Sequence, residues 1–189
     1  MVRVRKVLTR PLVVAVLVVA VGGVGFGLYW FQPWKLWQDT TVDEALPGVV
    51  TSVPSAAAPP EGSRGRPSPA AGPRTLASGE LISHEHQTSG TAKLVRLADG
   101  SHVLRLENLA TSSGPDLRVW LTDAPVKQGL AGWRVFDDGR YVSLGALKGN
   151  KGSQNYALPR DVDPAGYSSV SIWCDRFDVS FGAAELARA

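Results

Sequence analysis

One cysteine carries much of the reactive chemistry that this sequence could perform. Cys174 is the single Cys among 189 residues, so the chain can form neither an internal disulfide nor a zinc site made of cysteines alone. Three roles are open to it: a small apolar side chain in the core, a redox thiolate, or a sulfur ligand of a metal or haem. Its place after Val170 and Ile172 in an alternating apolar series favours the core. A thiolate would need a neighbouring positive charge, which Arg176 or a histidine would supply.

Two histidines are spaced for metal binding. His84 and His86 lie two residues apart, and on a β-strand both rings would point to the same face. Such a pair can chelate copper or zinc, and Cys174 would complete a site of two histidines and one cysteine. The alternative is a solvated loop over residues 83–87. No CxxCH motif is present, which excludes covalent c-type haem and leaves a metal or a non-covalent haem as candidate cofactors.

A glycine-rich stretch, residues 145–156, is rich in hydrogen-bond donors. Its side chains could cradle an anion together with backbone N–H groups, or they could brace a long loop across one end of a sheet. It lacks the ending of a nucleotide-binding P-loop. The candidate ligand-binding residues in and beside this loop are Lys148, Asn150, Gln154, Asn155 and Tyr156.

The residues that would position this chemistry follow the pattern of short β-strands. Residues 93–97 and 102–106 alternate in polarity around Asp99 and Gly100, which is typical of a tight hairpin. About seven such strands with turn signals near every tenth residue predict an all-β domain over residues 76–187. An antiparallel β-sandwich is favoured, with a small β-barrel as the alternative.

The alternation changes phase near the cysteine. Val170, Ile172 and Cys174 occupy even positions, whereas the next apolar residues, Phe177 and Val179, occupy odd ones. A single extra residue in a β-bulge would explain the change, and so would a turn between two strands.

The N-terminal part predicts a membrane anchor. Residues 11–31 contain no charge and are long enough to cross a bilayer as a helix, which makes the lipid bilayer the first expected partner. The basic tail at residues 1–10 predicts a cytoplasmic N-terminus and an extracytoplasmic C-terminal domain, in a single-pass protein of the cell membrane. A cleaved signal peptide is the alternative interpretation.

Two further segments separate this helix from the predicted domain. Residues 32–46 form a juxtamembrane segment, and residues 47–75 are rich in Pro, Ala, Ser and Gly and predict a disordered, extended linker. The net charge of +3 comes from the N-terminal tail, because from residue 74 onward there are 13 basic and 13 acidic side chains. Nucleic acid is therefore not an expected partner.

Three strings of the C-terminal region resemble a known family. GPDLRVWL, YVSLGALKGNKGSQNYALP and SVSIWCDRFDVSFGAAEL, together with His86 and Gly90, are similar to the electron-transfer DM13 domain. The resemblance implies an extracytoplasmic β-rich module with a redox role, in which the cysteine at position 174 acts. It also implies a separate redox partner protein, because no DOMON or haem-carrying module follows.

Two functions remain as hypotheses. The first is a membrane-anchored domain that takes part in electron transfer centred on Cys174, with His86, Asp116 and Arg176 as its candidate partners. For Asp116 the competing role is an Asx turn before an apolar strand. The second is a non-enzymatic envelope module that binds a ligand or a protein, with a structural, buried Cys174. No nucleophile elbow, zinc-protease motif or hydrolase carboxylate pair is recognisable.

Overall fold

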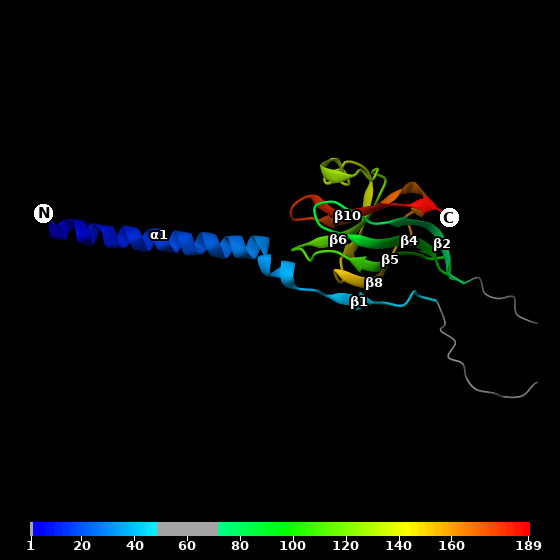
Figure 1. The fold of residues 1–189 in the computed structure, drawn as a ribbon, viewed down its shortest axis with the longest axis horizontal. Helices are drawn as coiled ribbons and strands as arrows, with labels where there is room; N and C mark the ends of the chain where they lie inside the picture. Colours follow the sequence, from blue (N-terminus) through cyan, green and yellow to red (C-terminus); the bar gives the residue numbers. More distant parts are fainter. Residues whose placement is uncertain (1, 49–71) are drawn as a thin grey trace, which may run out of the picture. The chain divides into compact units, whose positions relative to one another are not determined.

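The computed structural model describes residues 2–48 and 72–189, in two compact units that divide after residue 38 (Figure 1). The first unit contains α1 (Val2–Phe31) and a short 3-10 helix, η1 (Pro33–Trp37). Most of the linker predicted at residues 47–75 lies outside the described residues. The second unit contains all the β-strands.

One helix is long and apolar enough to cross a membrane. The span that meets this criterion is Arg10–Lys35, 26 residues with a mean hydropathy of 2.5 in its most apolar window. Pro11 lies inside α1, near the start of the charge-free stretch. An N-terminal apolar helix followed by a β-rich part agrees with the sequence-based expectation.

The second unit is a β-sandwich of two sheets. The six-stranded sheet has the order β1-β8-β5-β4-β2-β11, formed by β1 (Thr41–Asp43), β8 (Lys151–Ala157), β5 (His102–Ala110), β4 (Ser89–Arg96), β2 (Arg74–Glu80) and β11 (Ala187–Arg188). The five-stranded sheet has the order β3-β10-β9-β6-β7, formed by β3 (Ile82–Ser83), β10 (Val179–Glu185), β9 (Ser169–Cys174), β6 (Leu117–Thr122) and β7 (Tyr141–Ala146). Two distinct sheets confirm the predicted sandwich.

The hairpin at Asp99 and Gly100 forms as predicted. Gly100 has a φ of 83°, a left-handed conformation that glycine adopts without a steric cost. Leu97 N donates to Ser101 O at 2.8 Å, and β4 then pairs with β5 in antiparallel register, Lys93 opposite Arg105. This pair lies at the centre of the six-stranded sheet.

The apolar side chains form two clusters on opposite faces of the five-stranded sheet. The larger one draws on both sheets and includes Cys174. The smaller one contains Trp120, Phe136 and Trp173 and packs under the connection between β6 and β7, which carries η2 (Gly129–Gly132). The alternation along β9 therefore buries side chains on both of its faces.

A turn explains the phase change after Cys174. β9 ends at Cys174, the chain turns, and β10 begins at Val179, directly opposite Cys174 in the antiparallel register. A bulge is also present, but it lies later, between Ser180 and Gly182. The alternative of two separate strands is thus confirmed for this position.

Residues 41–43, which precede the predicted linker, form a strand that the sequence did not predict. β1 pairs with β8 in parallel, with Val42 opposite Gly152, whereas the other strand pairings in the described residues are antiparallel. β1 and β2 therefore belong to the same sheet, although residues 44–73 separate them along the chain. A strand of three residues is too short for a period-two pattern to show.

Candidate functional site

Cys174 is the last residue of β9 and is fully enclosed, with no exposed surface. In the register of the five-stranded sheet it stands between Leu117 of β6 and Val179 of β10. Both neighbours belong to the apolar cluster that draws on the two sheets. The sulfur atom therefore has no direct contact with solvent in the folded domain.

Main-chain N–H groups surround the sulfur. Burial raises the pKa of the Cys174 thiol, while hydrogen bonds from the backbone N–H groups of Arg176, Phe177 and Asp116 act in the opposite direction. The negative charge of Glu85 raises this pKa further. The net effect keeps the thiol protonated at neutral pH, the reverse of an activated thiolate.

Asp116 and Arg176, expected as partners of Cys174, reach the sulfur through their main chains. The main chain of Asp116 also accepts a hydrogen bond from Asp175 N at 3.0 Å, which ties the segment before β6 to the turn after β9. The Asp116 side chain instead faces Arg118, with Nε and Oδ1 3.4 Å apart, and Arg118 also pairs with Asp175. Asp116 and Arg176 thus lie next to Cys174 as predicted, but their main-chain N–H groups, and not their charged side chains, contact its sulfur.

The two histidines lie in different surroundings. His84 is buried and packs against Phe136, with ring centroids 5.7 Å apart, whereas the ring of His86 packs against Phe181 at 3.9 Å. β3 ends at Ser83, so the two rings do not share one strand face, which corrects the geometry expected from their spacing. Among residues 2–48 and 72–189, no three His, Cys, Asp or Glu side chains are grouped so that they could hold a metal ion.

His84 has a hydrogen bond at each ring nitrogen. Nε2 lies 3.0 Å from the Lys127 carbonyl, which can only accept, so Nε2 carries the proton; Nδ1 then accepts from Ser180 Oγ at 2.8 Å. Ser171 Oγ donates in turn to Ser180 Oγ at 2.9 Å. Burial lowers the pKa of His84. This side chain fastens the β6–β7 connection to β10 as a neutral imidazole.

The comparison with protein families agrees with this architecture. A family model described as electron transfer DM13 matches residues 80–186, more than half of the chain. The chain belongs to the DM13 family. No match was found among the curated proteins or the solved structures. The matched range contains Cys174 and both histidines but neither α1 nor β1.

In this DM13 chain, the loop predicted over residues 145–156 is shorter than expected, because β7 ends at Ala146 and β8 begins at Lys151. Gln154 and Tyr156 therefore lie on a strand. Gln154 is fully buried; its Nε2 donates to Gly149 O at 2.7 Å, and its Oε1 accepts from Tyr156 Oη at 2.7 Å. Tyr156 Oη accepts in turn from Lys148 N at 3.0 Å. Burial raises the pKa of Tyr156 to about 12. From β8, these two side chains brace the short connection between β7 and β8.

The other predicted loop residues contact the segment that precedes the linker. Lys148 Nζ donates to Glu44 Oε1 at 2.7 Å, and Asn155 Nδ2 donates to Ala45 O at 2.9 Å. Asn150 Oδ1 accepts from Thr40 N at 2.7 Å. The donors that suggested an anion site are thus used by acidic and main-chain groups of the DM13 protein itself.

A row of stacked aromatic rings runs along the outer face of the five-stranded sheet. Trp120 stacks on Tyr141 with centroids 4.0 Å apart and on Trp173 with centroids 4.8 Å apart. Trp173 also meets Phe136 edge-on at 6.4 Å. The row runs from Tyr141, 45% exposed, to Trp173, 1% exposed. Sequence patterns did not predict this row, because strand order decides which rings meet.

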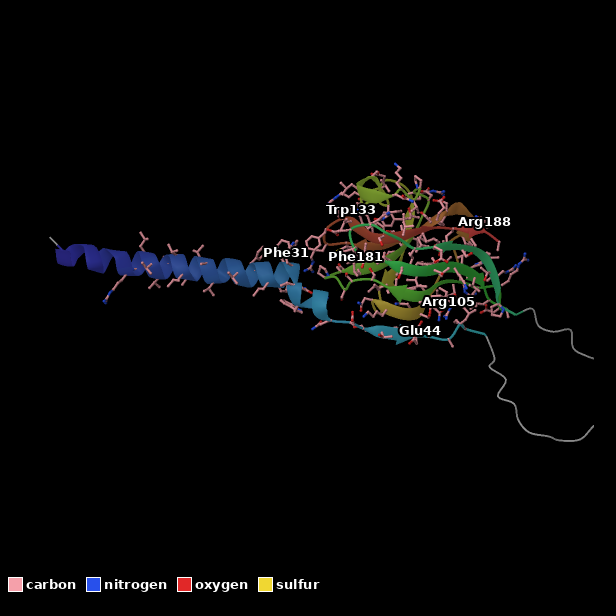
Figure 2. The ribbon with its side chains drawn as sticks, in the orientation of Figure 1. Phe31, Glu44, Arg105, Trp133, Phe181 and Arg188 are labelled. Atoms are coloured by element: carbon pink, nitrogen blue, oxygen red, sulfur yellow. The ribbon has the colours of Figure 1, made fainter. Side chains whose placement is uncertain are left out.

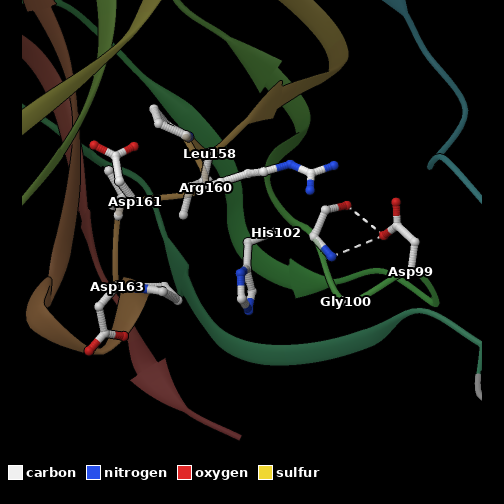
Figure 3. A pocket seen from close by; sticks show the side chains of 11 residues that line it. Asp99, Gly100, His102, Leu158, Arg160, Asp161 and Asp163 are labelled. Atoms are coloured by element: carbon white, nitrogen blue, oxygen red, sulfur yellow. Dashed lines mark hydrogen bonds between the residues drawn. The ribbon is translucent and has the colours of Figure 1, made fainter.

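An open pocket of about 450 Å³ lies beside the β4–β5 hairpin of the DM13 domain (Figure 3). Asp99, His102 and Arg160 contribute to its lining. The carboxylate of Asp99 accepts hydrogen bonds from Ser101 N and Oγ at 2.9 and 2.6 Å, which holds the turn. The lining mixes acidic, basic and apolar groups, so it favours no single class of ligand.

Proposed function

We propose that this chain is a single-pass membrane protein whose DM13 domain passes single electrons between a redox partner and the interior of its five-stranded sheet, outside the cytoplasm. The family and the apolar helix support the general statement. The passage of electrons to the interior of the sheet is supported by the row of Tyr141, Trp120 and Trp173. This row joins an exposed ring to the residue next to Cys174.

Burial of Cys174 limits the chemistry open to its sulfur. A mixed disulfide requires a partner thiol to touch the sulfur, and that atom is fully enclosed. Electrons can move between groups that are not in contact with the partner, and stacked rings provide a route of short steps. Cys174 is in this proposal the terminal donor because it directly follows Trp173, the last tryptophan of the row, along β9. The main-chain N–H groups at its sulfur raise its reduction potential and so favour its re-reduction after the electron has left.

The proposed step balances in electrons and protons. A one-electron oxidant of the metal-ion class, docked at Tyr141, takes one electron from the phenol, and the phenolic proton passes to water. An electron supplied through Trp120 and Trp173 restores the ring, which takes a proton back from water. Cys174 supplies that electron and becomes a thiyl radical, and its thiol proton passes to water when the turn after β9 opens. A one-electron reductant of the metal-ion class later returns an electron through the same rings, and the sulfur takes a proton back from water. Because one proton accompanies each electron, the potential of Cys174 is expected to fall as pH rises.

Trp120 is suited to pass on an electron without a proton. Its indole is 5% exposed, and Nε1 has no hydrogen-bond acceptor in the described part of the chain. An oxidised indole at this position has no neighbouring group to take its N–H proton. Such a relay would return to the neutral indole by gaining one electron alone.

The test is the lifetime of the Tyr141 radical in the full-length protein in detergent. A ruthenium polypyridyl photo-oxidant generates tyrosyl radicals, and the Tyr141→Phe variant identifies the part of the electron paramagnetic resonance signal that belongs to Tyr141. Trp120→Phe is expected to lengthen that lifetime several-fold, because refilling from inside is interrupted. The matched control is Trp133→Phe, an indole outside the row.

Two outcomes separate the parts of the proposal. An unchanged lifetime in Trp120→Phe would refute the ring relay. A lifetime that lengthens in Trp120→Phe but not in Cys174→Ala would keep the relay and remove Cys174 as its donor. Unfolding curves of each variant verify that the domain remains folded.

Orientation is testable separately. The basic residues at positions 1–10 support a cytoplasmic N-terminus. A cysteine introduced at Leu130, which is 76% exposed, should react with a membrane-impermeant maleimide in intact cells. A cysteine at Arg5 should react only after lysis, and the opposite pattern would reverse the proposed orientation.

A further inference from the structure

We propose that the outer edge of β8, the one away from β5, and the loop before it form a binding site for an acidic, extended peptide segment, and that residues 39–45 of the same chain occupy it. The domain is then held to its N-terminal anchor by strand pairing as well as by the covalent chain. This inference is independent of the proposed electron transfer.

The main chain makes the first set of contacts. β1 adds to the edge of β8 in parallel, with Thr41 opposite Lys151 and Asp43 opposite Ser153. Lys151 N donates to Thr40 O at 3.2 Å, and Glu44 N donates to Ser153 O at 2.8 Å. Addition of an extended peptide to a sheet edge supplies affinity through such main-chain hydrogen bonds, whatever the peptide sequence.

Charged side chains add selectivity for acidic residues. Lys148 Nζ donates to both carboxylate oxygens of Glu44, to Oε1 at 2.7 Å and to Oε2 at 3.0 Å. Oε2 of Glu44 also accepts a hydrogen bond from Asn155 N at 2.8 Å. Asp39 pairs with Lys151 at the other end of the segment. These partners lower the pKa values of both Glu44 and Asp39. The site therefore favours carboxylates at both ends of a short extended segment.

One buried amide depends on this segment. Asn150 is 4% exposed, and its Oδ1 accepts from Thr40 N while its Nδ2 donates to Asp39 and to Thr111 O. Buried polar atoms are nearly always hydrogen-bonded. Removal of residues 39–45 would therefore leave the Asn150 amide without its bonds to Thr40 and Asp39. Arg105 adds a further bond, from Nη1 to Glu44 O at 2.9 Å, and Figure 2 shows Arg105 and Glu44 at the same edge.

A glycine makes room for the segment. A Cβ atom at Gly149 would collide with the Thr40 carbonyl oxygen and would lie 2.8 Å from the Val42 Cγ2 atom. Gly149 therefore permits the close approach of β1 to the loop. Its replacement by alanine offers a steric way to block docking without a change of charge.

In this proposal the Pro-rich segment is not the sole link between the domain and the N-terminal part of the chain. Residues 44–73 join β1 to β2, two strands of the same sheet, and the pairing of β1 with β8 forms a second link that does not depend on them. A protease that cuts between residues 49 and 71 would then leave the domain attached to the N-terminal part. A simple spacer would instead release the domain on cleavage.

The experiment uses the full-length chain in detergent with a site-specific protease sequence inserted after residue 60. After complete cleavage, an affinity tag at the N-terminus captures the anchor, and the C-terminal fragment is quantified by immunoblot. The wild-type fragments are expected to co-purify at physiological salt. Gly149→Ala and Lys148→Glu are expected to raise the released fraction several-fold.

Charge reversal provides the matched controls. Glu44→Lys should release the domain, and the double variant Glu44→Lys with Lys148→Glu should restore retention. Arg160→Glu, which makes the same change of charge in the pocket beside the hairpin, should behave as the wild type. Wild-type fragments that separate as completely as those of Gly149→Ala would overturn the proposal.

A peptide tests whether the site accepts a segment in trans. A synthetic peptide of residues 39–45, added in excess to the cleaved protein, should displace the anchor fragment. The same peptide with its carboxylates replaced by amides should displace far less. Co-purification that resists the acidic peptide would place the attachment elsewhere and refute this site.

Discussion

The surroundings of Cys174 and the edge of β8 satisfy their polar groups by different means. At Cys174 the partners are main-chain N–H groups within an apolar cluster, and they are set by the pairing of three neighbouring strands. At the β8 edge the partners are charged, half-exposed side chains from a segment about a hundred positions earlier in the chain. The stability of the region around Cys174 should therefore depend on packing, whereas that of the β8 edge should depend on salt concentration and pH.

Loss of a buried aromatic ring should give the largest decrease in the free energy of unfolding. Trp173→Ala is expected to lower the free energy of unfolding by about 3–5 kcal/mol, because the indole is 1% exposed and contacts rings on both sides. Urea unfolding followed by circular dichroism measures this change at low and at high salt. A loss that varied strongly with salt would contradict the assignment of this region to packing.

His84 should give an intermediate effect that depends on pH. His84→Leu removes both ring hydrogen bonds and is expected to cost about 1–3 kcal/mol. Burial lowers the pKa of His84 in the folded state, so the unfolded state binds more protons. Stability is complete above about pH 6.5 and falls as the pH drops toward the folded-state pKa. Thermal unfolding between pH 5 and 8 should show this slope in the wild type and a flatter profile in His84→Leu.

Removal of the sulfur should cost less. Cys174→Ala is expected to lower the free energy of unfolding by about 1–2 kcal/mol, since a small enclosed atom and its N–H contacts are lost. The native thiol should resist iodoacetamide and react fully in denaturant. Rapid alkylation of the native protein would show that the sulfur is accessible and would contradict its enclosure.

The charged edge should give the smallest change in stability. Lys148→Met is expected to cost no more than about 1 kcal/mol, because its pairing with Glu44 is half-exposed. Glu44 and Asp39 have lowered pKa values, so their contribution is present above their ordinary pKa values and lost as pH falls below them. Hydrogen exchange at Val42 should report this local loss. A salt-independent effect larger than that of Cys174→Ala would reverse the comparison between the two regions.

Local patterns predicted much of the sheet. The alternation along residues 170–174 placed Cys174 inside, and the Asp99–Gly100 pair predicted its hairpin correctly, because both signals involve neighbours in the chain. The resemblance to the DM13 family is confirmed by the family model that matches residues 80–186. The prediction that the rings of His84 and His86 share one face was wrong, because it required a strand through both residues and β3 ends at Ser83.

Composition, hydropathy and period-two patterning were sufficient to predict an apolar N-terminal helix and an all-β domain. They favoured a core position for the cysteine but left its redox and ligand roles open. Contacts between distant segments were beyond their reach: the parallel docking of β1, the N–H groups around the sulfur, and the stacking of Tyr141, Trp120 and Trp173. Such contacts depend on strand order and register, which arise when the two sheets pack together. A linear pattern records the face on which a side chain lies, whereas only the folded chain decides which side chain it meets there.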